Sequence, residues 1–124
     1  MIHSQKISVT VAGAAGSAAG SATSARPLCG ELLAVYIDHT SGAATADVTI
    51  ATTHAPVKTL LTVTDSATDA WYYPRYIIHS EAAAALTGTS GGDRATHPID
   101  GYVTVTVAQS DAGSVDVWIV TRGM

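Results

Sequence analysis

The densest group of chemically informative residues is the run Trp71-Tyr72-Tyr73-Pro74-Arg75-Tyr76, which holds four aromatic rings and one guanidinium. Aromatic residues and Arg supply most of the binding energy at protein interfaces, and aromatic rings also stack on sugars. Three interpretations stay open: rings that fill a core, rings that form a subunit interface, and a sugar-stacking platform. The candidate interface residues are Trp71, Tyr72, Tyr73, Arg75, Tyr76 and, near the C-terminus, Trp118.

The motif Gly88-Thr89-Ser90-Gly91-Gly92 matches the G-x-S-x-G pattern of serine hydrolases. That pattern exposes its serine only at a sharp turn between a strand and a helix. Here an Ala-rich segment precedes it and Asp93-Arg94-Ala95-Thr96-His97-Pro98 follows, which favours a flexible loop. The lone Cys29 stands before Gly30 with no nearby basic residue except Arg26, which indicates a buried or inert thiol and not a nucleophile.

The histidines and carboxylates show no spacing that is typical of a metal or acid–base site. The five histidines (His3, His39, His54, His79 and His97) form no H-E-x-x-H pair. Asp65 and Asp69 bracket a turn, where an Asp side chain ordinarily bonds its own backbone. We therefore expect no catalytic residue, cofactor or metal, with a metal site assembled by the fold as the alternative.

Composition limits the class of protein. The chain has 124 residues, enough for one domain, with 47% hydrophobic and only 13% charged residues. Its net charge is −4 and its six Lys and Arg residues are scattered, which argues against a nucleic-acid partner. It has no run of about 18 apolar residues that could span a membrane as a helix. The lone thiol fits synthesis in a cytoplasm.

Alternation of apolar and polar residues predicts strands along most of the chain. Residues 31–38 are apolar on both faces, which predicts a central strand covered on both sides. Proline removes a ladder donor, so the aromatic strand 70–78 is expected at an edge or bent at Pro74. The remaining predicted strands are 6–12, 47–52 and 57–64.

The C-terminal part of the chain predicts a hairpin. Residues 101–108 and 114–121 are its two strands, joined by a turn through residues 110–113. Val103, Val105 and Val107 share one face, and Val115, Val117 and Ile119 share the matching face of the partner. Trp118 then falls on the other face, beside Thr104 and Thr106.

Two further segments differ from this pattern. Ser80–Leu86 carries the only helical signal, with Ser80 as a possible cap. Gly13–Ala25, rich in Ala, Gly and Ser, is read as a flexible loop or arm. The whole chain, 1–124, is thus expected to be one all-β domain. Its predicted form is an antiparallel β-sandwich or jelly roll of about six to eight strands with at most one short helix.

An ordered set of segments resembles the capsid decoration, or cement, proteins of tailed bacteriophages. The segments are Leu33–Asp38, Ala46–Ile50, Leu60–Asp65, Thr68–Arg75, Val103–Gln109 and Val115–Val120. The resemblance implies a β-rich protein of the virion capsid surface, without catalytic residues, that bridges neighbouring major capsid protein subunits. Low charge fits a large buried interface, and a symmetric homo-oligomer, a dimer or trimer, is expected.

The sequence is also compatible with two other functions. One is a phage tail, neck or head-closure component with the same sandwich. The other is a carbohydrate-binding β-sandwich that stacks sugars on Trp71, Tyr72 or Trp118. An enzyme is the weakest reading, because no nucleophile–base pair is visible in the sequence.

Overall fold

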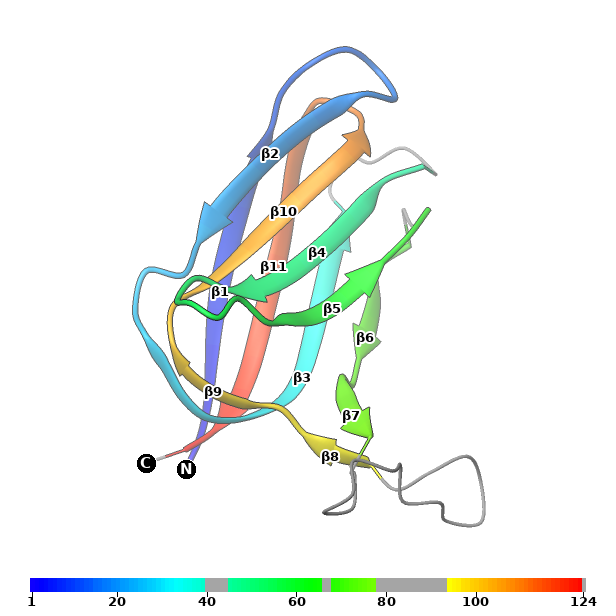
Figure 1. Ribbon diagram of the computed structural model, residues 1–124. Coiled ribbons are helices and arrows are strands. Elements are labelled where there is room, and N and C mark those ends of the chain that lie inside the picture. Colours follow the sequence, from blue (N-terminus) through cyan, green and yellow to red (C-terminus); the bar gives the residue numbers. More distant parts are fainter. Residues whose placement is uncertain (40–44, 66–67, 78–93, 124) are drawn as a thin grey trace.

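The computed structural model describes residues 1–39, 45–65, 68–77 and 94–123. Two antiparallel sheets pack face to face, with the chain termini side by side at one end (Figure 1). The β-sandwich prediction is therefore confirmed. The described residues contain eleven strands and no helix. The predicted helix 80–86, the motif 88–92 and His79 lie outside these residues.

The first sheet has five strands. β1, β11, β3 and β6 follow one another in that order, and β9 pairs with the first part of β3. Their bounds are β1 Ile2–Val11, β11 Gly113–Arg122, β3 Leu28–His39, β6 Ala70–Tyr72 and β9 Pro98–Gly101. β3 is central, as predicted, and β6 ends the row, which confirms the expectation of an edge position near Pro74.

The second sheet has four strands in the order β2, β10, β4 and β5, and it lies in front in Figure 1. Their bounds are β2 Ala18–Thr23, β10 Val103–Ser110, β4 Asp47–Thr52 and β5 Thr59–Val63. A separate two-stranded ribbon pairs β7 (Arg75–Ile77) with β8 (Arg94–Thr96). Four short strands, β6 to β9, raise the count above the predicted six to eight.

The core consists of β-branched and Leu side chains on the two facing surfaces. Its fully buried members include Val9, Val35, Ile37, Val48, Ile50, Val103, Val105, Val107, Val115, Val117 and Ile119. Burial of these chains follows the alternation read from the sequence, because successive side chains of a strand point to opposite faces. The hydrophobic effect thus places one apolar face of each sheet against the other.

The predicted C-terminal hairpin is wrong. β10 pairs with β2 and β4, whereas β11 pairs with β1 and β3, so the two strands belong to opposite sheets. In one sheet, their two apolar faces would lie side by side. Across the sandwich those faces stack on each other, with the turn formed at Gln109 (φ 52°) and Gly113 (φ 149°). Trp118 consequently points away from Thr104 and Thr106, on the other side of the molecule.

The loop prediction is wrong for residues 18–23, which form β2 at the edge of the second sheet. Ala12 and Ala19 exchange two backbone hydrogen bonds of 3.1 and 3.0 Å, and these join the edges of the two sheets. A side chain at Gly20 would meet the Thr10 carbonyl oxygen at 2.1 Å. The small residues therefore permit β1 and β2 to close this side of the sandwich.

Candidate interaction surface

Four side chains from four neighbouring strands form one row across the outer face of the five-stranded sheet. Lys6 of β1 lies opposite Trp118 of β11, Trp118 opposite Tyr36 of β3, and Tyr36 opposite Trp71 of β6. Each residue is an outward position of its strand, because its two sequence neighbours point the other way. The antiparallel register thus gathers residues from positions 6 to 118 into what we call the aromatic row.

The members of the aromatic row contact one another in sequence. Lys6 Nζ lies 5.2 Å from the centre of the Trp118 ring, a cation–π distance. The Tyr36 ring centre lies 5.9 Å from that of Trp118 and 5.0 Å from that of Trp71, with tilts of 56° and 51°. Such tilted contacts stabilise a sheet surface, so the row is held in place before any partner arrives.

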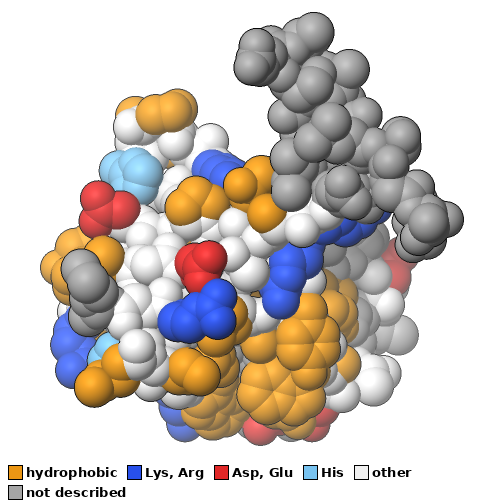
Figure 2. All heavy atoms as spheres, turned by 90° about the horizontal axis from the view of Figure 1, so that it is seen from below, with side chains coloured by type: hydrophobic (Ala, Val, Ile, Leu, Met, Phe, Trp, Pro, Cys, Tyr) orange, Lys and Arg blue, Asp and Glu red, His pale blue; other side chains and the backbone are white. Residues whose placement is uncertain are grey.

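The end of the row at β6 carries large apolar side chains that stay exposed. Trp71 keeps 52% of its surface exposed, and Tyr73, just past β6, keeps 63%. The view from below in Figure 2 shows hydrophobic side chains gathered in a broad group with charged groups beside it. Large apolar side chains that stay exposed together indicate a binding surface. For Trp71 and Tyr73 the core interpretation is therefore wrong.

The six predicted interface residues do not form one site. Trp71 and Trp118 belong to the aromatic row and Tyr73 lies beside it, whereas Tyr72 is half-buried and packs against the core. Arg75 donates from Nη1 to the carbonyl oxygens of Leu33 at 3.1 Å and Pro74 at 2.7 Å. Its guanidinium thus fixes the backbone at the break between β6 and β7.

Tyr76 belongs to a second cluster at the ribbon. Its ring centre lies 5.5 Å from that of His97 and 5.0 Å from Lys58 Nζ. His97 is buried, and its Nδ1 has no hydrogen-bond partner in the described residues. Burial lowers the pKa of His97, and the positive charges of Lys58 and Arg75 lower it further. This cluster therefore favours a neutral imidazole.

Glu31 ties three strands together near the ribbon. Arg122 of β11 donates from Nε to Glu31 Oε2 at 2.8 Å, and Thr96 of β8 donates to Oε1 at 3.1 Å. The hydrogen bond from Arg122 is the main cause of a lowered pKa at Glu31. The carboxylate serves here as an acceptor that joins the ribbon to the main sheet.

Sequence reasoning missed Lys6 and Tyr36. The sequence predicts that residues 31–38 are covered on both faces, and this is wrong for one face. In the described residues no second layer covers Tyr36, which is half-buried between Trp118 and Trp71. Tyr36 shares its strand face with Asp38, a polar position in an apolar run. That charge was the available signal that this face meets solvent.

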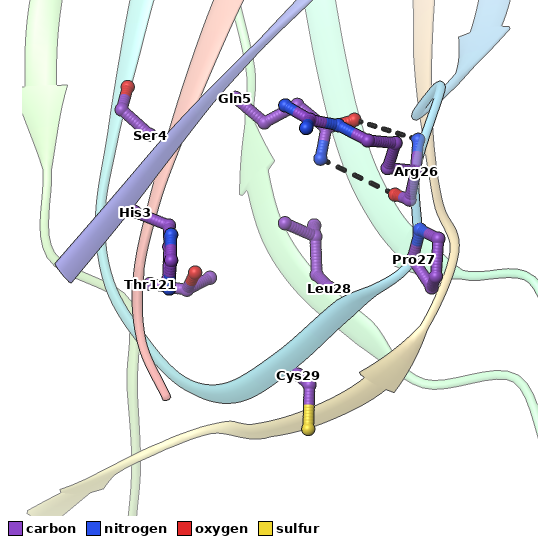
Figure 3. A pocket seen from close by; sticks show the side chains of 8 residues that line it. All are labelled: His3, Ser4, Gln5, Arg26, Pro27, Leu28, Cys29 and Thr121. Carbon is purple, nitrogen blue, oxygen red and sulfur yellow. Dashed lines mark hydrogen bonds between the residues drawn. The ribbon is translucent and has the colours of Figure 1, made fainter. Parts of the chain in front are cut away.

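A small pocket of about 250 Å³ opens where β1, β11 and the start of β3 meet (Figure 3). The Gln5 side chain donates from Nε2 to the Arg26 carbonyl oxygen at 3.3 Å and accepts the Arg26 N–H at 3.1 Å. Cys29, also at this pocket, is an exposed free thiol that Figure 3 shows directed away from Gln5. Polar groups of the pocket wall thus serve to join β1 to the loop before β3.

The remaining titratable residues are dispersed. His3 lines the small pocket, while His54 lies beside Gly101. Asp65 donates its N–H to Asp47, and Asp69 Oδ1 accepts the N–H of His39 at 2.8 Å. Within the described ranges, no three His, Cys, Asp or Glu side chains lie close enough to share a metal ion.

No helix in the described part of the chain is long and apolar enough to cross a membrane. Comparison of the chain with protein-family models, with curated proteins and with solved structures gives no match.

Proposed function

We propose that this chain is a non-enzymatic structural protein of a phage virion, which decorates the capsid surface and bridges major capsid protein subunits. The observation that carries the proposal is the aromatic row with its exposed end at Trp71 and Tyr73. An exposed group of aromatic rings on a rigid sheet is the usual anchor of a protein interface. The sequence resemblance supplies the kind of partner.

Ring geometry favours a protein partner over a sugar. Tyr36 is inclined by 51° to Trp71 and by 56° to Trp118, so the three rings do not share one plane. A flat sugar-stacking platform of several rings requires coplanar rings, which this row does not provide. A sugar could thus stack on only one of these rings at a time.

The decisive experiment is co-sedimentation of the purified chain with capsids of the phage that encodes it. We expect saturable binding with a copy number comparable to that of the major capsid protein. Trp71→Ala should weaken binding about tenfold or more, because it removes the exposed Trp ring at the end of the aromatic row. Tyr102→Ala is the matched control, since Tyr102 is exposed but lies between β9 and β10, outside the aromatic row.

Each alternative has its own outcome. Binding at a copy number that matches a single vertex would favour the tail, neck or head-closure component. Failure to sediment with capsids, together with quenching of Trp fluorescence by glycans, would favour the carbohydrate module.

The proposal includes a dimer or trimer of the chain, because symmetric copies on one shell multiply modest contacts. Light scattering across about a hundredfold dilution measures this directly. A mass that stays at two or three chains supports the assembly, and a mass of one chain at every concentration removes the obligate oligomer.

A further inference from the structure

An acidic row runs beside the aromatic row on the same face of the sheet. Asp116 lies directly opposite Asp38 in the register of β11 and β3. Asp116 is two residues from Trp118, and Asp38 is two residues from Tyr36, so each carboxylate shares a strand face with a ring. Asp69 precedes β6 and its carboxylate reaches the backbone of His39 at 2.8 Å. Three carboxylates therefore border the rings on one side.

One ring–carboxylate pair already holds a cation from this chain. Lys6 Nζ lies 3.5 Å from Asp116 Oδ2 and 5.2 Å from the centre of the Trp118 ring. The ammonium thus satisfies a carboxylate and a π face at once. This is the combination that a cation prefers on a protein surface.

The neighbouring pair has the same arrangement without the cation. Tyr36 and Asp38 repeat on β3 what Trp118 and Asp116 form on β11, and Trp71 adds a second ring. Among the described residues, no Lys or Arg forms an ion pair with Asp38. Asp38 lies opposite Asp116, whose charge Lys6 already balances, so the Asp38 carboxylate is the negative charge that remains beside Tyr36 and Trp71.

A cation of this chain lies at the other border of the rings. Arg75 donates to the carbonyl of Leu33, which is on the side of Tyr36 away from Asp38. The positive charge of Arg75 is thus held by backbone carbonyls away from Asp38, and the acidic border is the one that attracts a positive group. The charged groups therefore make one border of the rings acidic, and that border favours a cationic ligand.

We propose that Tyr36, Asp38 and Trp71 bind the guanidinium of an Arg side chain from an extended segment of the partner protein. The planar group packs on the exposed Trp71 ring beside the half-buried Tyr36, and its N–H groups donate to the Asp38 carboxylate. Arg is favoured over Lys, because a guanidinium is flat and more weakly hydrated than an ammonium. That the segment belongs to the major capsid protein rests on the proposed function.

The binding test uses acetylated tri-arginine amide and tri-lysine amide as probes, at equal ionic strength. Readouts are Trp fluorescence and the NMR signal of the Trp71 indole N–H. We expect tri-arginine to bind several-fold tighter than tri-lysine. Asp38→Asn should weaken it by about fivefold or more, since it removes the charged acceptor. Asp100→Asn removes one exposed charge elsewhere, on β9, and should change binding less than about twofold.

Two results would overturn the proposal. One is equal binding of the arginine and lysine probes. The other is an equal effect of Asp38→Asn and Asp100→Asn, which would show that the net charge of the protein alone attracts the probe. A thermal melt of Asp38→Asn checks that the sheet is intact, and Asp38→Glu should retain part of the binding if the carboxylate acts directly.

Capsid binding by the same variants separates this inference from the proposed function. If Trp71→Ala loses capsids while Asp38→Asn binds them like wild type, the decoration role stands and the guanidinium site is wrong. If tri-arginine binds through Asp38 but the chain never sediments with capsids, the site stands and the decoration role is wrong.

Discussion

The side-chain amide of Gln5 bonds both backbone groups of Arg26, donating to its carbonyl oxygen and accepting its N–H (Figure 3). The Gln5 side chain thus imitates the backbone hydrogen bonds of a paired strand. It does so at the connection between β2 of the second sheet and β3 of the first. Only an amide side chain can make both hydrogen bonds, because a carboxylate could accept the Arg26 N–H but could not donate to the Arg26 carbonyl oxygen.

Gln5→Glu should therefore destabilise the fold by about 1–2 kcal/mol at neutral pH, since the new carboxylate faces the Arg26 carbonyl. Chemical denaturation measures the change. Ser8→Ala, on the exposed face of the same strand, should remain within about 0.5 kcal/mol. Wild-type stability in Gln5→Glu would show that the paired bonds do not hold β1 to the loop.

Gly30 lies at a close approach between β3 and the end of β11. Its φ is +116°, and an added Cβ would lie 2.1 Å from the Arg122 carbonyl oxygen and 2.7 Å from Gly123 Cα. We expect Gly30→Ala to cost roughly 3 kcal/mol or more, from the clash and the backbone strain together.

Gly16→Ala is the control for the backbone strain alone. Gly16 has φ +79°, and an added Cβ would have nothing within 4 Å. Its cost should be about 1–2 kcal/mol. Equal melting temperatures for the two variants would contradict the close approach at Gly30.

Adjacent residues of β11 should respond in opposite ways to truncation. Val117 is fully buried between the sheets, so Val117→Ala should cost roughly 2–3 kcal/mol through lost burial and a cavity. Trp118 faces outward with Lys6 and Tyr36, so Trp118→Ala should cost less stability but weaken binding of the partner. Urea unfolding and capsid co-sedimentation separate the two effects, and a larger stability loss in Trp118→Ala would reverse the assigned faces.

Acid should weaken the fold through His97. Burial lowers the pKa of this imidazole from 6.5 in the native state, so the unfolded chain takes up its proton first as the pH falls. Since stability rises with pH wherever the unfolded state binds more protons, stability should drop as the pH falls below 6.5 and level off below the native pKa.

Urea midpoints at about pH 7.5 and about pH 5.5 measure this loss, and His97→Gln should reduce it because a Gln side chain does not titrate. His39 contributes in the same direction, as burial lowers its pKa while Asp69 and Asp38 oppose that shift. His3→Gln, at an exposed position, is the control. An acid-induced loss that is unchanged in His97→Gln would exclude this role.

The sequence by itself determined which side chains face inward in the strands that alternate strictly between apolar and polar residues. The strict period of two in residues such as Val103, Val105 and Val107, or Val115 and Val117, predicts burial on one face, and these side chains are fully buried. Burial of alternate apolar residues is a local consequence of strand geometry, so it can be read without knowing the partner strands. The all-β class and the break at Pro74 follow from the same local signals.

Only the tertiary structure decided which sheet each strand joins. β10 and β11 alternate alike and are separated by a short turn, so the sequence does not distinguish a hairpin from two strands stacked across the core. Segment 18–23 lacks strong β-formers, yet its small residues let it pack against β10 and close to β1. The aromatic row depends on this assembly, because long-range register, not local pattern, places Lys6, Trp118, Tyr36 and Trp71 side by side.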